Sequence, residues 1–145
     1  MKRFFCISSL IFILLSCNLN SIDKDKERIN NECNNFMKAF LNSKVHDAIN
    51  ILRQNSVIAK PQLDTLERTI EAQVKDGFYS YGKMISYDFI SEASVKDIIS
   101  KRFYVLRLEN YYLKFEFVLY KSSSKWTITN FQYNDDILEI LKRAK

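Results

Sequence analysis

The feature that most constrains the fold of this chain is a change in hydrophobic spacing at Gly77. Before Gly77, apolar residues recur every three or four positions, which is the period of a helix with one buried face. After it, they alternate with polar residues, which is the period of a half-buried strand. Fifteen of the twenty aromatic residues lie between Phe78 and Tyr133. A helical half followed by a strand-rich half favours an α+β domain.

Three amphipathic helices are expected before Gly77. Their apolar faces consist of Ile29, Cys33, Phe36, Met37, Phe40 and Leu41 in the first, Val45, Ala48, Ile49 and Leu52 in the second, and Leu63, Leu66, Ile70 and Val74 in the third. Ser43, in the turn after the first helix, is expected to cap the second. Pro61 suits the first turn of the third helix, and Gly77 suits its end.

Four strands are expected after Gly77, over residues 84–92, 99–109, 111–120 and 125–133, with a short helix over 137–141. In the third strand, Tyr111, Leu113, Phe115, Phe117 and Leu119 form one face, and Lys114 and Glu116 lie on the outer face. Consecutive strands with short connections predict an antiparallel meander that is half covered by helices. The predicted fold class is therefore α+β, with N-terminal helices packed on a curved four-stranded antiparallel sheet.

Two stretches carry a family resemblance, the aromatic-rich Tyr111–Tyr120 and the strand Trp126-Thr127-Ile128-Thr129-Asn130-Phe131. Together with the preceding helices, they make residues 30–135 similar to the cone of the nuclear transport factor 2-like, cystatin-like superfamily. The resemblance implies a cavity between the helices and the concave face of the sheet. Some members use an acid or a His–Asp pair there for isomerase or cyclase chemistry, whereas others only bind ligands or partners. A different helix-on-sheet arrangement is the alternative.

The N-terminus has the organisation of an export signal. Residues 1–3 are basic, and residues 4–15 form an apolar stretch. As a helix this stretch is about 18 Å long, too short for the ~30 Å hydrocarbon core of a membrane. The sequence Leu14-Leu15-Ser16-Cys17 resembles the lipobox of bacterial lipoproteins. The resemblance implies cleavage before the cysteine, a diacylglyceryl group on its sulfur and a fatty acid such as palmitate on the new amino terminus. An ordinary secretory signal with an incidental cysteine is the alternative.

These patterns divide the chain into three parts. We expect a lipoprotein signal peptide over residues 1–16, a lipidated Cys17 with a solvated polar tether over 17–27, and a single α+β domain over 28–145. The resemblance implies a location in the cell envelope, with the protein lipid-anchored to a membrane. In a Gram-negative type of cell, the expected location is the outer membrane or the cell surface.

Few residues are available for catalysis or for holding a cofactor. A phosphate-binding loop needs several glycines, and this chain has only two. An ordinary zinc site needs several histidine or cysteine ligands, and the expected domain has only His46 and Cys33. Removing Lys2 and Arg3 with the signal lowers the formal net charge from +5 to +3. Charges of opposite sign alternate along the chain, which argues against nucleic-acid binding. We therefore expect no cofactor, no metal and no catalytic residue.

Non-enzymatic binding of a protein or a small apolar ligand is the function that we expect, because tyrosine and tryptophan combine contact area with a hydrogen-bonding tip. The candidate ligand-binding residues are Tyr87, Tyr104, Arg107 and Trp126, and the lipobox resemblance implies that Cys17 is the lipid attachment site. The alternative is a cavity enzyme of the isomerase or cyclase type with Asp88 as its base. That alternative requires an enclosed cavity with an acid such as Asp88 at its floor.

Overall fold

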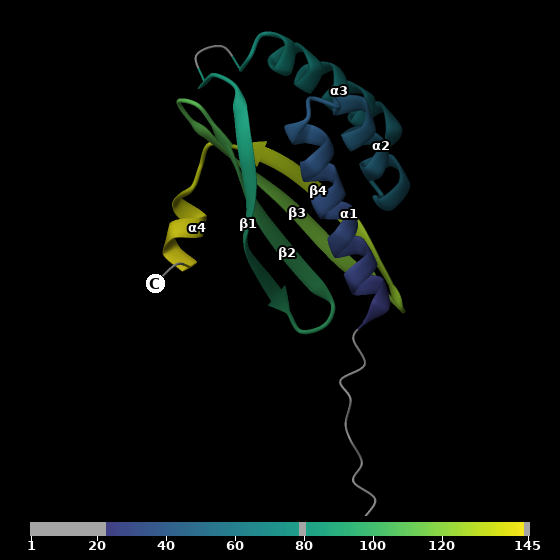
Figure 1. Cartoon of the computed structure of the whole chain (residues 1–145). Helices are drawn as coiled ribbons and strands as arrows, with labels where there is room; N and C mark the ends of the chain where they lie inside the picture. The colour runs from purple at the N-terminus through teal and green to yellow at the C-terminus, as the bar shows by residue number, and fades with distance from the viewer. Residues whose placement is uncertain (1–22, 79–80, 144–145) are drawn as a thin grey trace, which may run out of the picture.

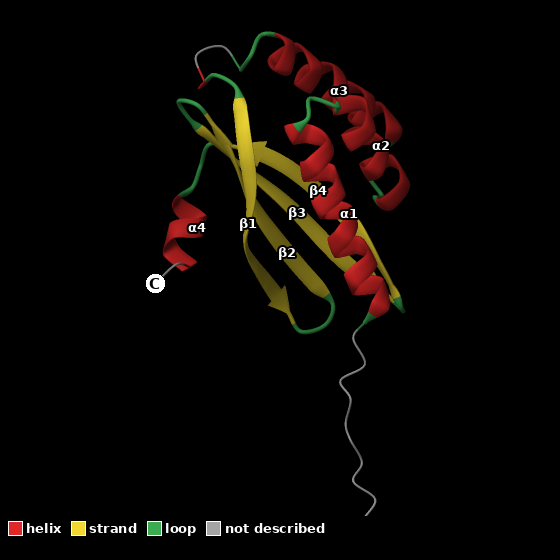
Figure 2. Cartoon of the chain, in the orientation of Figure 1, coloured by secondary structure: helices red, strands yellow, loops and turns green. Residues whose placement is uncertain are grey.

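The computed structural model describes residues 23–78 and 81–143 and contains a helical layer and a sheet (Figure 1). The elements are α1 Lys24–Leu41, α2 Val45–Asn55, α3 Lys60–Lys75, β1 Met84–Val95, β2 Ile99–Leu108, β3 Tyr112–Ser122, β4 Lys125–Asn134 and α4 Leu138–Arg143. Helices α1 to α3 lie on one side of the sheet (Figure 2). The predicted α+β class, with N-terminal helices on a four-stranded antiparallel sheet, is confirmed.

The start of α1 corrects one predicted boundary. The segment 17–27 is predicted as a tether, but residues 24–27 form the first turn of α1. The carboxylate of Asp23 explains the early start, because it accepts hydrogen bonds from the backbone N–H groups of Asp25 and Lys26 at 3.1 Å each. The predicted signal peptide and Cys17 lie outside the described residues. Within residues 23–78 and 81–143, no helix is both long and apolar enough to cross a membrane.

The turns between the helices agree with the sequence except at Ser43. The sequence predicts Ser43 as the cap of α2, but the N-cap is Lys44, whose side chain makes no capping hydrogen bond. Ser43 instead has a φ of 58°, and its N–H donates to the carbonyl of Phe40 at 2.9 Å, so it ends the preceding helix. Pro61 stands in the first turn of α3 as predicted. Gly77 follows its end with a φ of 64°, a conformation that glycine adopts without strain.

The four strands pair in the order β1-β2-β3-β4, all antiparallel. In this register Tyr104 lies opposite Phe115, and Phe117 lies opposite Phe131. These side chains point toward α1–α3, on what we call the inner face, and the alternate residues point to the outer face. The register of β1 shifts at Ile85 and again at Ile90, which are β-bulges.

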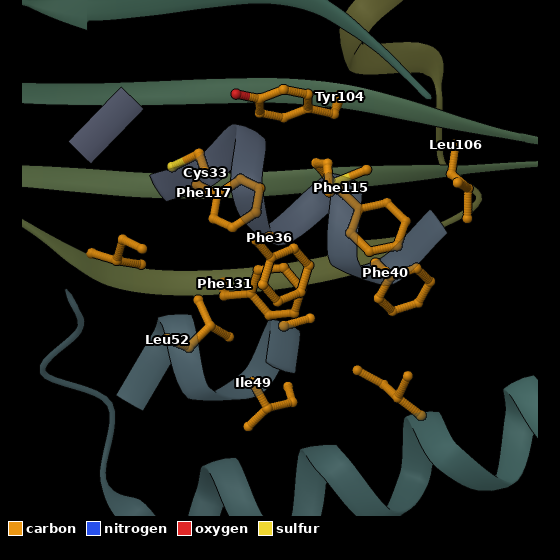
Figure 3. Packing of buried hydrophobic residues seen from close by; sticks show 14 of the residues in the cluster. Cys33, Phe36, Phe40, Ile49, Leu52, Tyr104, Leu106, Phe115, Phe117 and Phe131 are labelled. Atoms are coloured by element: carbon orange, nitrogen blue, oxygen red, sulfur yellow. The ribbon is translucent and has the colours of Figure 1, made fainter. Parts of the chain in front are cut away.

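Aromatic rings fill the space between α1 and the inner face (Figure 3). The ring of Phe36 lies 4.8 Å from that of Phe131 and 5.3 Å from that of Phe117, centroid to centroid. The ring of Phe40 lies 4.9 Å from that of Phe115. All of these except the rim residue Phe131 are completely buried. The predicted apolar face of the third strand is buried from Leu113 to Leu119, but Tyr111 precedes β3 and is 37% exposed. Rings therefore occupy the region in which the family resemblance implies a cavity.

The outer face is charged and yet partly covered. Lys114 and Glu116 point outward as the alternation predicts, but their side chains are only 3% and 2% exposed. Helix α4 lies on this face, where Glu139 is 3.5 Å from the Nζ of Lys101 and 3.8 Å from that of Lys114. Lys101 also pairs with Glu116 at 2.9 Å. The charged side chains of Lys114 and Glu116 are thus nearly removed from water on the face that α4 covers.

Candidate functional site

Two of the candidate ligand-binding residues, Tyr87 and Tyr104, lie together on the inner face beside α1. Their ring centroids are 6.4 Å apart. The hydroxyl of Tyr104 donates to the Oδ1 of Asn34 at 2.6 Å, and that of Tyr87 donates to the Asn34 carbonyl at 3.4 Å. Tyr104 is completely buried, and this burial raises its pKa to about 12. Both rings therefore hold α1 on the sheet.

A charged cluster lies next to the two tyrosines, at the rim of the inner face. The carboxylate of Glu92 pairs with the Nζ of Lys26 at 2.7 Å, with Arg102, and with the hydroxyl of Ser100. Burial raises the pKa of Glu92. The hydrogen bonds from Lys26 and Ser100 and the charge of Arg102 lower that pKa by more than burial raises it, so the net pKa is below the ordinary value. Sequence reasoning missed this cluster because its members are distant in the chain and Lys26 falls in the predicted tether.

Trp126 fastens the beginning of α1 to β4. Its indole Nε1 donates to the Oδ2 of Asp23 at 3.0 Å, and its backbone N–H donates to Asp25. The ammonium groups of Lys26 and Lys121 lie over its ring, at 4.3 and 5.7 Å from the centroid. Trp126 is only 1% exposed, so it packs in the core and leaves almost no surface for a ligand.

Arg107 is not brought together with the other three candidates. It lies on the outer face, where its Nε is 3.5 Å from the Oδ2 of Asp88 and donates to the hydroxyl of Ser86 at 2.7 Å. The side chains of Arg107 and Asp88 are 61% and 58% exposed. Asp88 is therefore on the opposite side of the sheet from the helices, and it is not the floor of an enclosed cavity as the enzyme alternative requires.

The two other candidates for chemistry are also separated. Cys33 is completely buried on α1, and burial raises its thiol pKa to about 12, which leaves little reactive thiolate. His46 is exposed on α2, with its Nδ1 2.6 Å from the Oε1 of Glu67. Glu67 also pairs with Arg53. In the part of the chain that the structure describes, no three His, Cys, Asp or Glu side chains are arranged to hold a metal.

Exposed apolar side chains gather on β1 and on its turn to β2. Eleven large hydrophobic side chains are exposed among the described residues, and six of them fall between positions 85 and 99. These six are Ile85, Phe89, Ile90, Val95, Ile98 and Ile99. We call the first three the β1 apolar row. Alternation within the strand does not predict this exposed row, because Ile85 and Ile90 stand at the two bulges, where the pairing of β1 with β2 is interrupted.

Phe89 is the best-supported member of the β1 apolar row. The guanidinium of Arg102 lies over its ring, 4.5 Å from the centroid, and the ring of Tyr104 meets it edge to face at 5.4 Å. About half of the Phe89 side chain still faces solvent. The ring is therefore held in one orientation while it presents an apolar face outward, which is the arrangement found at the centre of many protein interfaces.

An open groove of about 460 Å³ lies between the α2–α3 turn and β4. Its walls include Val57, Leu63, Leu66 and Phe131. Leu63 and Phe131 are core residues with less than a tenth of their surface exposed. Two of the apolar walls of this groove therefore belong to the core and offer little surface to a partner.

Comparison with solved structures gives only a distant similarity of shape. No family model matches the chain, and no curated protein matches it. One solved structure, that of a DUF4783 family protein from Bacteroides uniformis ATCC 8492, is similar with a TM-score of 0.35 and 19% sequence identity. The similarity covers 50% of this chain and 62% of that one. No conclusion about function follows from it.

Proposed function

We propose that the chain is a bacterial lipoprotein of the cell envelope, held on a membrane through acylated Cys17. In this proposal its exported domain belongs to the nuclear transport factor 2-like, cystatin-like type. The domain acts without catalysis, by binding a protein partner through the β1 apolar row. The exposure of Ile85, Phe89 and Ile90 on one strand is the observation that carries the binding part of the proposal.

The lipid anchor is supported by the order of features at the N-terminus. A basic start leads directly into a twelve-residue apolar stretch, and the lipobox-like sequence Leu14-Leu15-Ser16-Cys17 begins with the last two residues of that stretch. Each buried methylene of an acyl chain contributes about 0.8 kcal/mol to membrane binding, so two or three chains give a durable anchor.

A protein partner is better supported than a small apolar ligand. Phenylalanine rings fill the space between α1 and the sheet, which is where a ligand of a cone-shaped domain would bind (Figure 3). The bulges at Ile85 and Ile90 interrupt the edge of β1, so addition of a partner strand along its whole length is disfavoured. The contact that remains is through apolar side chains, with Phe89 at its centre.

The anchor is tested by replacing Cys17 with alanine in the full chain. We expect the wild-type protein to partition into the detergent phase and its mature N-terminus to carry the mass of acyl groups, and we expect the Cys17→Ala variant to lose both properties. Retention of the variant in the detergent phase contradicts the lipid anchor.

The binding surface is tested by site-specific photo-cross-linking in the producing cells. A photoreactive residue at position 90 should give one protein adduct, whereas the same residue at Val57, which is 69% exposed on the α2–α3 turn, should not. Phe89→Asp should remove the adduct while the fold is retained, because about half of the Phe89 side chain already faces water. Equal adducts from both positions, or an adduct that survives Phe89→Asp, contradict the proposed surface.

A further inference from the structure

Three segments that are distant in the sequence meet at one end of the domain (Figure 1). The Nζ of Lys121 lies 2.7 Å from the Oδ2 of Asp23, just before α1, and 2.5 Å from the Oδ2 of Asp97, in the β1–β2 turn. The backbone N–H of Lys121 also donates to the carbonyl of Ile98 at 2.8 Å. We call this region, formed by the start of α1 and the β1–β2 and β3–β4 turns, the hairpin end.

A row of apolar side chains crosses the sheet at the hairpin end. Val95 pairs with Ile99 in the register of β1 and β2, and Ile99 pairs with Tyr120 in that of β2 and β3. Side chains paired in this way are about 4.5–5.5 Å apart at Cβ and lie on the same face. All three are exposed, and so is Ile98 in the turn between them. Water therefore covers a continuous apolar strip here.

The segments that form the hairpin end also carry exposed lysines. Lys24, Lys96 and Lys125 are exposed at the start of α1 and in the two turns. The nearby acids Asp23 and Asp97 both pair with Lys121, which reduces their effect on the field of this surface. Apolar and tyrosine side chains with a rim of lysines are the residues that an anionic membrane interface favours.

The position of Asp23 limits how far this surface can lie from the proposed anchor. Asp23 is six positions after Cys17, and this length of chain spans at most about 22 Å when fully extended. The other end of β1 is further away, because the ten residues from Ile85 to Val95 extend the strand by about 33 Å. Of the exposed apolar surfaces described above, the hairpin end is therefore the one that the anchor holds near the bilayer.

We propose that the hairpin end docks on an anionic lipid bilayer, with Val95, Ile98, Ile99 and Tyr120 in the interfacial layer and the lysines against the headgroups. This inference rests on the proposed acylation of Cys17. Docking of this kind fixes the orientation of the domain. The β1 apolar row then extends away from the membrane, where a protein partner reaches it.

The test uses the full acylated chain in vesicles of phosphatidylethanolamine with a minority of phosphatidylglycerol. A nitroxide label is attached to Ile98→Cys in the β1–β2 turn and, as the matched control, to Ile85→Cys near the other end of β1. Cys33 does not compete for the label because it is completely buried. We expect the ratio of collisions with oxygen to collisions with a water-soluble nickel chelate to be several-fold higher at position 98 than at position 85. Changing Lys96 and Lys125 to glutamate should lower that ratio at position 98.

The outcomes separate the two proposals. Protein that floats with the vesicles and carries acyl groups, but whose label at position 98 reports water, overturns the docking and leaves the anchor intact. A label at position 98 that is immobilised without greater contact with oxygen indicates a protein contact, either a second copy or a partner, and also overturns the docking. Protein without acyl groups overturns both.

Discussion

The two faces of the sheet exclude water with different chemistry. On the inner face, Phe115 and Phe117 pack against rings from α1; on the outer face, Lys114 and Glu116 are almost as deeply buried beneath α4. Apolar packing needs only side chains of suitable volume, whereas each buried charge needs a partner. Because one strand supplies all four residues, alternation alone does not distinguish a solvated face from a covered one.

The largest expected loss of stability comes from removing a buried ring from the inner face. Phe117→Ala should lower the free energy of unfolding by about 3–5 kcal/mol, since it removes a buried ring and leaves a cavity. The lost ring lies 5.3 Å from that of Phe36 and 5.1 Å from that of Phe131, centroid to centroid. Urea denaturation measures the loss. Phe117→Leu is the matched control and should cost about 1–1.5 kcal/mol. An alanine variant with near-native stability would show that this face is not packed.

The second effect comes from breaking the outer face. Glu116→Ala leaves Lys114 buried with Glu139 as its remaining acidic neighbour, at 3.8 Å. We expect a loss of about 2–3 kcal/mol in urea denaturation, less than the 3–5 kcal/mol typical of a fully orphaned charge.

A double variant shows whether this loss of stability comes from the unpaired charge of Lys114 or from lost packing. Lys114→Met with Glu116→Leu removes both charges and keeps the volume, so it should lie within about 1 kcal/mol of the wild type. If the double variant is destabilised as much as Glu116→Ala, the loss of stability comes from packing. The two faces of the sheet then do not differ in how they depend on charge pairing.

Much of the fold was predictable because it depends on local sequence. The helical faces around Phe36 and Ile49, the starting turn at Pro61 and the inward-facing residues of β3 all follow from spacing within one element. Alternation within β2 also puts Arg107 and Tyr104 on opposite faces of the sheet, but alternation does not indicate which face the helices cover.

The rest depends on contacts between distant elements. Lys26, Glu92 and Arg102 meet only because α1 crosses the end of the sheet, and no spacing within one element indicates that crossing. The coverage of Lys114 by α4 likewise depends on the path of the chain after β4. The exposure of Ile90 depends on a bulge, which is an interruption of the alternation used to predict the strand.

Replacing Glu92 in the charged rim of the inner face should have a smaller effect on the free energy of unfolding, and this effect should depend on pH. The folded-state pKa of Glu92 lies below the ordinary 4.5, so its ion pairs stabilise the protein above that pH and are lost as the pH falls through the folded value. At pH 7, Glu92→Gln should cost about 1 kcal/mol, because water screens the partly exposed carboxylate. Urea denaturation at a series of pH values should show the difference from wild type shrinking below pH 4.5. A difference that does not change with pH contradicts this role.

The smallest effect is expected from the exposed ion pair of the outer face. Arg107 and Asp88 are more than half exposed and 3.5 Å apart, so Arg107→Ala should change the free energy of unfolding by no more than about 0.5 kcal/mol. A double-mutant cycle with Asp88→Ala should give a coupling energy near zero. The matched cycle on Lys101 and Glu116, also an outer-face pair between neighbouring strands, should give a clearly larger coupling because α4 excludes water there. Equal couplings in the two cycles would mean that α4 does not shield the charges, and that the buried and solvated parts of the outer face are energetically the same.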